Sequence, residues 1–292
     1  MQQENQPIGM FPAMTGDAYH AAPGDSSSTI KAVMEKSLLH YWHEYENPDR
    51  EADDPDQDEE KAAEKAADAK HDLDFGTVIH AAVLEPDTLP GLYVVSPPFN
   101  RRTTAGRTER KAFFAAHRDV AVLTEKEVKS VYAIRDRIYK HREIAPLLHG
   151  GKAEQSFFAR CPRTGALRKC RPDYMHDNGF AILDIKSAAT AHPKEFSRDA
   201  GKFAYDIGVP WYLDTLSDLY GEAPQHFIFI PIEKEPPYAM GLYYCKPPDI
   251  KRARECYQKQ WDRLIQARRT NYWPDYAGEQ AMPLDLPSYL NR

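Results

Sequence analysis

The sequence has little of what secreted, zinc-binding or membrane proteins depend on. Its 292 residues include four cysteines, which lie far apart and form no C-x-x-C pair, so neither a disulfide framework nor a zinc site is indicated. No apolar run approaches the ~20 residues of a membrane-spanning helix, and no basic segment followed by an apolar stretch marks a secretory leader. We therefore expect a cytoplasmic protein with reduced thiols and no membrane contact.

The excess of negative charge is confined to one segment. The net charge is −6, yet the segment from Glu44 to Asp74 holds 14 acidic and 4 basic residues, a net of −10, so the rest of the chain carries +4. A mildly basic body is compatible with a nucleic-acid partner, because the local field at a site matters more than total charge. The acidic insertion, residues 49–70, could mimic DNA or regulate access. We favour a solvated loop and exposed helix, because charge runs usually have that structure.

Composition and patterning indicate a globular chain. Apolar residues make up 42% and aromatic residues 11%, and the length is sufficient for an extensive core. Residues 1–25 mix Gln, Pro, Gly and Asp without periodicity, which predicts a mobile tail. Residues 26–292 are predicted to form a single domain. Its helical part spans 26–150, and its sheet part, which ends in a helix, spans 151–292.

Hydrophobic periodicity and stop signals place the individual elements. The runs 180–186 and 226–232 are almost wholly apolar, which predicts strands buried on both faces. The predicted fold class is α/β (α+β), with a mixed central sheet flanked by helices. Further strands are predicted at 92–95, 120–123, 154–159 and 167–173, and helices at 26–46, 74–85, 125–144, 193–204, 210–220 and 248–269.

The stretch LRKCRPDYMHDNGFAILDIKS, which begins at Leu167, carries the clearest chemistry. Asp173 ends one predicted strand, and Asp184 and Lys186 lie on the next, where alternation puts both on one face. Two carboxylates can hold Mg²⁺ with part of its water, and a nearby lysine can stabilise charge on a phosphate. The alternative is a surface ion pair between Asp184 and Lys186, but carboxylates beside a buried apolar run are costly without a partner.

Two further places offer weaker signals. His80 lies beside the apolar stripe of the helix that Asp74 is predicted to cap, where a lone histidine is more often a structural residue than a ligand. Arg101 and Arg102 open a basic loop that continues to Lys111. Clustered arginines beside hydroxyl groups suit phosphate contacts, and a solvated helix start accounts for them equally well.

Taken in order, these motifs resemble the PD-(D/E)XK nuclease superfamily, whose signature is similar to RPD from Arg171 and DIK from Asp184. The surrounding sequence resembles the RecE-like branch, the exonuclease VIII proteins of phages and prophages. LDFGT from Leu73, with the later His80 and LEP, is similar to an upstream element of that branch, and FNRRT from Phe99 is similar to its basic loop. The helix after Ser28 resembles its opening helix. The resemblance covers roughly residues 26–268 and implies a restriction-endonuclease-like core.

Residue by residue, the resemblance implies a divalent-metal site that takes Mg²⁺, with Mn²⁺ able to substitute. It makes His80 a ligand rather than a structural histidine. Lys186 takes the role of the catalytic lysine, and Glu154 takes that of the acidic residue on the preceding strand. The implied metal ligands are His80, Asp173, Asp184 and the backbone carbonyl of Ile185, and the implied DNA contacts are Arg101, Arg102 and Tyr212.

One position departs from the family pattern. The family carries a Gln-x-x-x-Tyr element on a helix after the site, where it contacts DNA near the scissile phosphate. In this chain the same frame reads Gly208 to Tyr212, and Pro210 is expected to start the helix late. The tyrosine is present but the glutamine is not, which puts one DNA contact in question.

The resemblance implies an exodeoxyribonuclease that binds the ends of linear double-stranded DNA. It would hydrolyse one strand in the 5′→3′ direction with Mg²⁺ and leave 3′ single strands. It also implies a ring-shaped homo-oligomer and a single-strand annealing protein as recombination partner. The alternatives are an endonuclease or single-strand nuclease of the same superfamily, and a non-catalytic DNA-end-binding or assembly protein. Gly208 favours the non-catalytic protein, and the complete Asp/Asp/Lys set argues against it.

Overall fold

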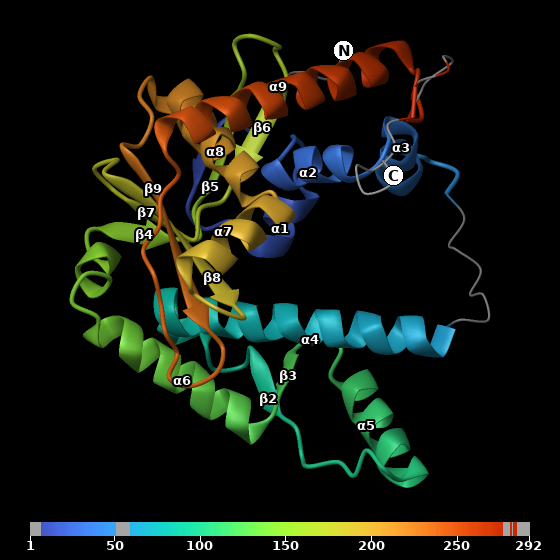
Figure 1. Ribbon diagram of the computed structural model, residues 1–292, viewed down its shortest axis with the longest axis vertical. Coiled ribbons are helices and arrows are strands. Elements are labelled where there is room, and N and C mark those ends of the chain that lie inside the picture. The colour runs from blue at the N-terminus through green and yellow to red at the C-terminus, as the bar shows by residue number, and fades with distance from the viewer. Residues whose placement is uncertain (1–6, 51–58, 277–280, 282, 285–292) are drawn as a thin grey trace, which may run out of the picture.

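The fold places a mixed sheet between two layers of helices. The computed structural model describes residues 7–50, 59–276, 281 and 283–284 (Figure 1). In the central sheet the order is β4-β7-β8-β9, with β8 and β9 parallel and the other neighbours antiparallel. This arrangement confirms the predicted fold class. The strands are β4 (Gly151–Ala153), β7 (Tyr174–His176), β8 (Ala181–Ala188) and β9 (His226–Glu233).

Strand β8 is buried on both faces, because its alternating side chains enter two separate cores. Ile182 packs among residues of the helices on one face, and Leu183 and Ile185 pack among residues of the helices on the other. Asp184 and Lys186 continue the Ile182 face toward the end of the strand. The first layer contains α2 (Ser27–Glu35), α8 (Tyr205–Tyr220) and α9 (Pro247–Thr270), and the second contains α4 (Glu59–Leu84) and α6 (Glu125–Lys140) (Figure 1).

The prediction of a mobile tail over residues 1–25 is wrong for residues 7–25, which are ordered. β1 (Gly9–Phe11) pairs antiparallel with β5 (Ser156–Arg160). Helix α1 (Gly16–Ala21) buries Tyr19 in a small core with Phe158. The pairing partners of β1 lie about 150 positions later in the sequence. Local periodicity could therefore not reveal that these residues are ordered. Residues 1–6 lie outside the described residues.

A buried ion pair anchors the end of this N-terminal segment. Asp25 is only 5% exposed. Its carboxylate accepts a hydrogen bond from the indole N–H of Trp261 at 2.7 Å and pairs with Arg268 at 2.8 Å. Arg268 also pairs with Glu46 at 2.6 Å. The carboxylate thereby ties the start of the chain to its last helix.

The helix predicted over residues 26–46 is in fact two helices. α2 begins at a capping box formed by Ser26 and Thr29, and α3 (Leu38–Tyr45) begins at its own cap, Ser37. The Ser37 hydroxyl accepts the His40 amide hydrogen bond at 3.3 Å. Serine competes in this way with a continuous helix, and the apolar spacing of the two helices conceals the break.

Helix α4 begins well before Asp74, the residue predicted to cap it. Asp74 lies inside the helix and pairs with Lys70 at 2.8 Å. The preceding Ala/Lys/Glu stretch has high helix propensity, which accounts for the earlier start. Of the acidic segment 49–70, residues 51–58 and the side chains up to residue 69 lie outside the described residues, so both predicted roles for it stay untested. Among the described helices, none combines the length and the apolar character needed to span a membrane.

Between α4 and α6 the chain forms a small parallel pair of strands and a projecting helix. β2 (Tyr93–Val95) pairs with β3 (Ala121–Leu123), and α5 (Thr104–Ala116) extends away from the sheet (Figure 1). Helix α6 begins at a capping box, in which Thr124 and Glu127 satisfy each other's backbone amides. Two short 3₁₀ turns follow the long helices: η1 (Pro86–Thr88) comes after α4, and η2 (Ala145–Leu148) comes after α6.

The antiparallel meander bends sharply at two adjacent positions. The strand predicted over 154–159 starts later, as β5, and Glu154 stands between β4 and β5 with a φ of 50°. The strand predicted over 167–173 ends early, as β6 (Leu167–Cys170), and Asp173 stands between β6 and β7. The amide of Glu154 donates to the carbonyl of Asp173 at 3.1 Å. Strands β1, β5 and β6 form a second sheet. Glu154 and Asp173 therefore lie where the chain passes between this sheet and the central one.

The helices after β8 differ from prediction at one boundary. α7 (Pro193–Lys202) agrees with it closely, whereas α8 begins at Tyr205 and contains Pro210 inside it. Proline favours the first turn of a helix, so the sequence pattern pointed to a start at Pro210. The helix starts earlier because Ala204, at φ 49° and ψ 44°, turns the chain between α7 and α8. Gly208 is therefore a buried helical residue rather than part of a loop.

The pair of His71 and Glu127 is expected to make stability depend on pH. His71 Nε2 lies 2.7 Å from Glu127 Oε1. Burial raises the pKa of Glu127, but hydrogen bonds from His71 and Thr124 outweigh it and lower that pKa to about 2 from 4.5. This stabilisation is present above pH 4.5 and lost as the pH falls toward 2. The hydrogen bond to Glu127 raises the pKa of His71 above 6.5. The stabilisation that protonated His71 contributes is therefore fully present below pH 6.5 and declines above it.

We expect Glu127→Gln to remove about 1 kcal/mol of this pH-dependent stability, allowing for partial solvent screening. The measurement is the urea midpoint at several pH values between 3 and 8. Glu125→Gln on the same turn is the matched control, because Glu125 pairs only with an exposed lysine. An equal pH dependence in wild type and Glu127→Gln would contradict the assignment.

Candidate active site

The central carboxylates meet at the end of β8. Asp173 Oδ2 accepts a hydrogen bond from the Ile185 amide at 2.7 Å, which fixes the loop before β7 against β8. One residue earlier on β8, Asp184 Oδ1 lies 2.6 Å from Lys186 Nζ. The predicted placement of Asp184 and Lys186 on one strand face thus agrees with the structure.

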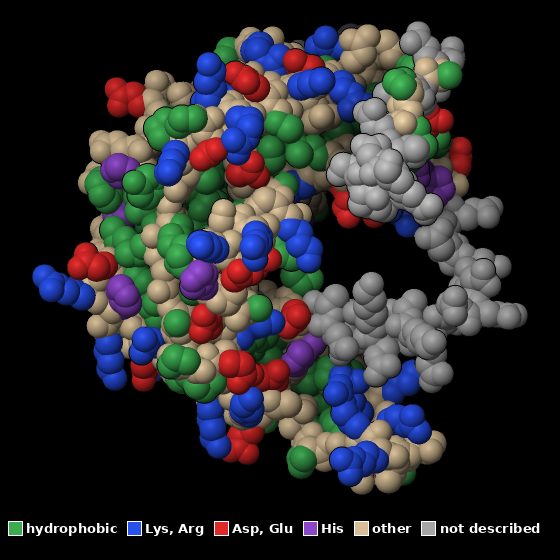
Figure 2. Space-filling view, in the orientation of Figure 1, with side chains coloured by type: hydrophobic (Ala, Val, Ile, Leu, Met, Phe, Trp, Pro, Cys, Tyr) green, Lys and Arg blue, Asp and Glu red, His purple; other side chains and the backbone are tan. Residues whose placement is uncertain are grey.

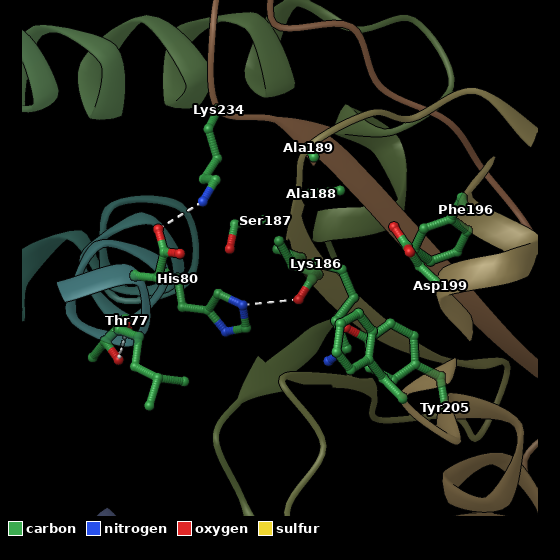
Figure 3. Close-up of a pocket in the computed structure, with 15 residues that line it drawn as sticks. Thr77, His80, Lys186, Ser187, Ala188, Ala189, Phe196, Asp199, Tyr205 and Lys234 are labelled. Carbon is green, nitrogen blue, oxygen red and sulfur yellow. Dashed lines mark hydrogen bonds and ion pairs between the residues drawn. The ribbon is translucent and has the colours of Figure 1, made fainter. Parts of the chain in front are cut away.

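His80 reaches the same point from helix α4, on the other side of β8. Its Nε2 donates to the Ile185 carbonyl at 2.8 Å, and its Nδ1 lies 3.6 Å from Asp173 Oδ2. Helix α4 can approach the strand because Gly76 has no side chain: a Cβ at that position would lie 3.2 Å from Ser187 Oγ. Figure 3 shows His80 projecting from α4 toward β8.

Glu154 completes a cluster of possible metal ligands. One ligand atom each from His80, Glu154 and Asp173 lies within 4.8 Å of the other two. Arg171 Nε holds the Glu154 carboxylate at 2.8 Å, and the same guanidinium donates to the Met14 carbonyl and Ser156 Oγ. Glu154 also has a left-handed backbone, a conformation that persists where the surrounding structure enforces it. Asp184 is not part of this three-residue cluster.

The electrostatics of the site favour an added cation. Burial raises the pKa of Glu154, and Asp173 adds to the shift. Burial also raises the pKa of Asp184, with Lys186 opposing. For Lys186, burial lowers the pKa, but Asp184 and Asp173 outweigh it and the net pKa is raised. Burial therefore disfavours the negative charge of Glu154 and of Asp184, and a bound cation would offset that cost.

One buried oxygen points to the same conclusion. No donor among the described residues reaches Asp184 Oδ1 with hydrogen-bond geometry, so its contact with Lys186 Nζ is an ion pair alone. Buried polar atoms normally have hydrogen-bond partners. A carboxylate oxygen that has an ion pair but no well-aligned hydrogen bond, beside two other carboxylates, can also interact with a cation.

The donor set fits a divalent ion. Octahedral Mg²⁺ holds its ligands at about 2.1 Å, which puts neighbouring ligand atoms about 3.0 Å apart and opposite ones about 4.2 Å apart. The hydrogen-bonded 2.8 Å between His80 Nε2 and the Ile185 carbonyl is also the separation of neighbouring ligands, so an ion that took the place of the Nε2 proton could contact both atoms. Carboxylate and carbonyl oxygens suit Mg²⁺ and Mn²⁺, whereas imidazole suits the transition metals. His80, Asp173, Glu154 and the Ile185 carbonyl can therefore hold such an ion, with Asp184 beside them.

Two cavities meet at His80. The first, of about 810 Å³, opens between α4, β8 and the start of α8, and its lining includes His80, Lys186 and Tyr205 (Figure 3). The second, of about 950 Å³, lies toward the N-terminal segment, and its lining includes His80, Glu154 and Arg171. Thr77 also lines both cavities. The possible metal ligands thus stand between two openings.

The residues predicted to contact DNA are not gathered at this cluster. Arg101 and Arg102 are exposed just before α5, where Lys and Arg side chains collect on the surface (Figure 2). Tyr212 lines the second cavity, and its hydroxyl donates to the Arg171 carbonyl at 3.3 Å. Gly208 is buried, and a Cβ there would meet nothing within 4 Å. DNA contact by Arg101, Arg102 and Tyr212 stays a prediction.

Sequence reasoning missed three residues around the site. Arg171 belongs to the RPD motif but was not predicted to be a site residue. Its spacing of two from Asp173 is the signal that could have suggested a position on the same face of a strand. Tyr205 and Lys31 lie beside Lys186 in space, and neither belongs to a motif. No sequence signal could have placed Lys31 there, because it comes from α2.

Comparison with known families agrees with this geometry. The family described as "PDDEXK-like domain of unknown function (DUF3799)" matches residues 26–282. The chain belongs to this family. Its membership in the PDDEXK-like group confirms the superfamily resemblance, while nothing in the match distinguishes a RecE-like branch. PDDEXK nucleases generally use divalent metals, which is consistent with the His80, Glu154 and Asp173 cluster.

Among solved structures, this PDDEXK-like chain is similar to a candidate exonuclease from Eubacterium rectale. The two share 14% identity at a TM-score of 0.61, over 94% of this chain and 96% of the other. At this identity the likeness shows the fold alone. No curated protein matches the chain.

Proposed function

We propose that the chain is a metal-dependent exodeoxyribonuclease that degrades linear double-stranded DNA from its ends. The observation that carries the proposal is the cluster of His80, Glu154 and Asp173, in which His80 contacts the Ile185 carbonyl and Asp173 the Ile185 amide, next to the buried Asp184–Lys186 pair. Membership in a PDDEXK-like family supports hydrolysis of a phosphodiester. The exonuclease candidate with the same fold supports attack at ends.

Each residue has a distinct task in this proposal. A divalent ion bound at the cluster would neutralise phosphate charge and make a water nucleophilic. Asp173 would help to hold the ion, and its carboxylate is oriented by the Ile185 amide. Asp184 keeps the Lys186 ammonium charged and oriented. Lys186 can then stabilise negative charge on the phosphate as the bond to the leaving oxygen breaks. Arg171 holds Glu154 in place.

The finer features of the proposal follow the RecE-like resemblance. We propose Mg²⁺ as the ion, with Mn²⁺ able to replace it, and digestion in the 5′→3′ direction that leaves 3′ single strands. The enzyme would act as a ring-shaped homo-oligomer and supply those strands to a single-strand annealing protein in phage-type recombination. The exposed basic residues Arg101 and Arg102 would contact the DNA backbone.

A digestion assay tests the proposal. We expect Mg²⁺ or Mn²⁺ to support loss of linear duplex, with the 5′-labelled end released first, and EDTA to abolish it. His80→Ala should raise the metal concentration for half-maximal rate about 10- to 100-fold, the usual range for a weakened metal site. His149→Ala, an exposed histidine away from the cluster, is the control. Cleavage of covalently closed circles would instead favour an endonuclease, and end binding without hydrolysis would favour a non-catalytic protein.

A further inference from the structure

An aromatic pair lies at the edge of the first cavity, next to the catalytic lysine. The rings of Phe203 and Tyr205 are stacked, with centroids 5.7 Å apart and planes 25° apart. Both residues line the cavity together with Lys186. Tyr205 is half-buried and backed by Phe196 and Phe229, whereas Phe203 is 48% exposed. The pair therefore presents a supported aromatic surface to solvent.

The backbone at this pair is strained. Ala204, which separates the two aromatic residues, has a left-handed conformation at φ 49° and ψ 44°. A residue with a Cβ is disfavoured there, and such outliers concentrate at functional sites. Side chains two positions apart do not face each other on a regular helix. The turn at the junction of α7 and α8 is what brings Phe203 and Tyr205 together.

Cationic side chains surround the aromatic pair. The ammonium groups of Lys186 and Lys31 lie 5.5 Å and 5.3 Å from the centre of the Tyr205 ring. Lys202 lies above the Phe203 ring at 5.1 Å. Lys186 is neutralised by Asp184, but Lys31 has no hydrogen bond or ion pair within the part of the chain that the structure describes. A half-buried ammonium group without an anion is costly.

The mixture of rings and ammonium groups matches one kind of ligand. Aromatic faces that stack bases, combined with cations that meet phosphates, are the means by which proteins bind single-stranded nucleic acid. Stacking of a base is stronger than a cation–π contact at an exposed site, so a base can displace the Lys202 ammonium from Phe203. Burial and then the charge of Lys186 lower the pKa of Lys31, and a bound phosphate would offset both effects.

We propose that Phe203, Tyr205 and Lys31 form a subsite for one nucleotide of the DNA strand that has separated from its complement. The base stacks on Phe203, and the adjoining phosphate contacts the Lys31 ammonium, with Lys186 and the scissile bond alongside. This deepens the proposed function, on which it rests for the identity of the ligand. The end of the duplex must therefore open before the strand reaches the metal ligands.

The test uses binding rather than hydrolysis. The probe is a short single-stranded oligonucleotide with 2-aminopurine near its 5′ end, titrated with the full chain in EDTA. We expect the fluorescence to be quenched by stacking, and Phe203→Ala to weaken binding about 5- to 150-fold and remove the quenching. Phe203→Trp should retain both. Phe180→Ala is the matched control, because Phe180 is a 38% exposed aromatic residue at the opposite end of β8.

The contribution of Lys31 is measured separately, through the salt dependence of binding. Lys31→Met keeps the aliphatic stem and should lower the slope of log affinity against log salt by about 0.7, the value for one lost phosphate contact on a single strand. Lys36→Met, an exposed lysine at the end of α2, should leave the slope unchanged. Melting curves confirm that each variant is folded.

The outcomes separate this subsite from the enzymatic proposal. No binding of the oligonucleotide, or equal affinity and quenching in wild type and Phe203→Ala, would overturn the subsite even if DNA is hydrolysed. Loss of binding in Phe203→Ala with no hydrolysis in any metal would support the subsite and overturn the exonuclease.

Discussion

Replacement of Asp184 by asparagine is expected to slow DNA hydrolysis by about 10³-fold or more, equivalent to about 4 kcal/mol of transition-state stabilisation. The Asp184 carboxylate is the partner of the Lys186 ammonium and stands beside the cluster of possible metal ligands. Asparagine has nearly the same shape but no charge. The variant therefore loses both the anchor for Lys186 and part of the negative charge that attracts a cation.

An effect on folding must be separated from the effect on the rate. Burial raises the pKa of Asp184, which means that the charged carboxylate is disfavoured by its surroundings. A neutral amide avoids that cost but leaves the buried Lys186 ammonium without its closest anion, so we expect a lower melting temperature and compare the rates at a temperature where both proteins are folded. The measurements are the initial rate on linear duplex and a thermal melt. Asp177→Asn, an exposed carboxylate in the β7–β8 turn, should keep full activity. An active Asp184→Asn would remove Asp184 from the catalytic machinery.

The largest effect on stability is expected at Asp25. We expect Asp25→Ala to lower the free energy of unfolding by about 2–3 kcal/mol, because the buried Trp261 N–H is left without an acceptor while the partly exposed Arg268 keeps Glu46. Arg268 would lose one of its two carboxylates, and the Trp261 N–H would lose its acceptor. No other described residue links the N-terminal segment to α9 through a buried carboxylate.

Chemical denaturation of Asp25→Ala measures this effect directly. Asp17→Ala is the control, since Asp17 is an exposed carboxylate in the first turn of α1. That control should change stability by no more than about 1 kcal/mol. A comparably small change in Asp25→Ala would show that the anchor contributes little and that the N-terminal segment is held by β1 and α1 alone.

The sequence predicted the centre of the fold well, for a physical reason. Strand β8 begins with an apolar run because both of its faces are buried there, and such runs are visible without knowledge of any partner. The alternation of a strand then placed Asp184 and Lys186 together. His80 could not be assigned in this way. Its neighbours on α4 gave no sign of a partner on β8, and only the resemblance to a nuclease family pointed to it.

The remaining site residues depend on geometry that one segment does not encode. The strand predicted over 154–159 includes Glu154, whereas a left-handed backbone sets this residue at a bend between β4 and β5. Arg171 acquires its role from contacts with Glu154 and Met14. The start of α8 was misplaced because Pro210 is tolerated inside the helix. In each case a contact between distant parts of the chain overrides the local preference.

His80 forms part of the wall of both cavities, and this has a consequence for how a long polymer could be processed. A centre that opens on one side must release its substrate before a cleaved piece can leave. With openings on two sides, a released nucleotide and the uncut strand can follow different routes. In the proposed exonuclease, the remaining DNA would keep its hold on the protein and advance by one unit after each cut, so repeated hydrolysis would not require repeated capture of an end.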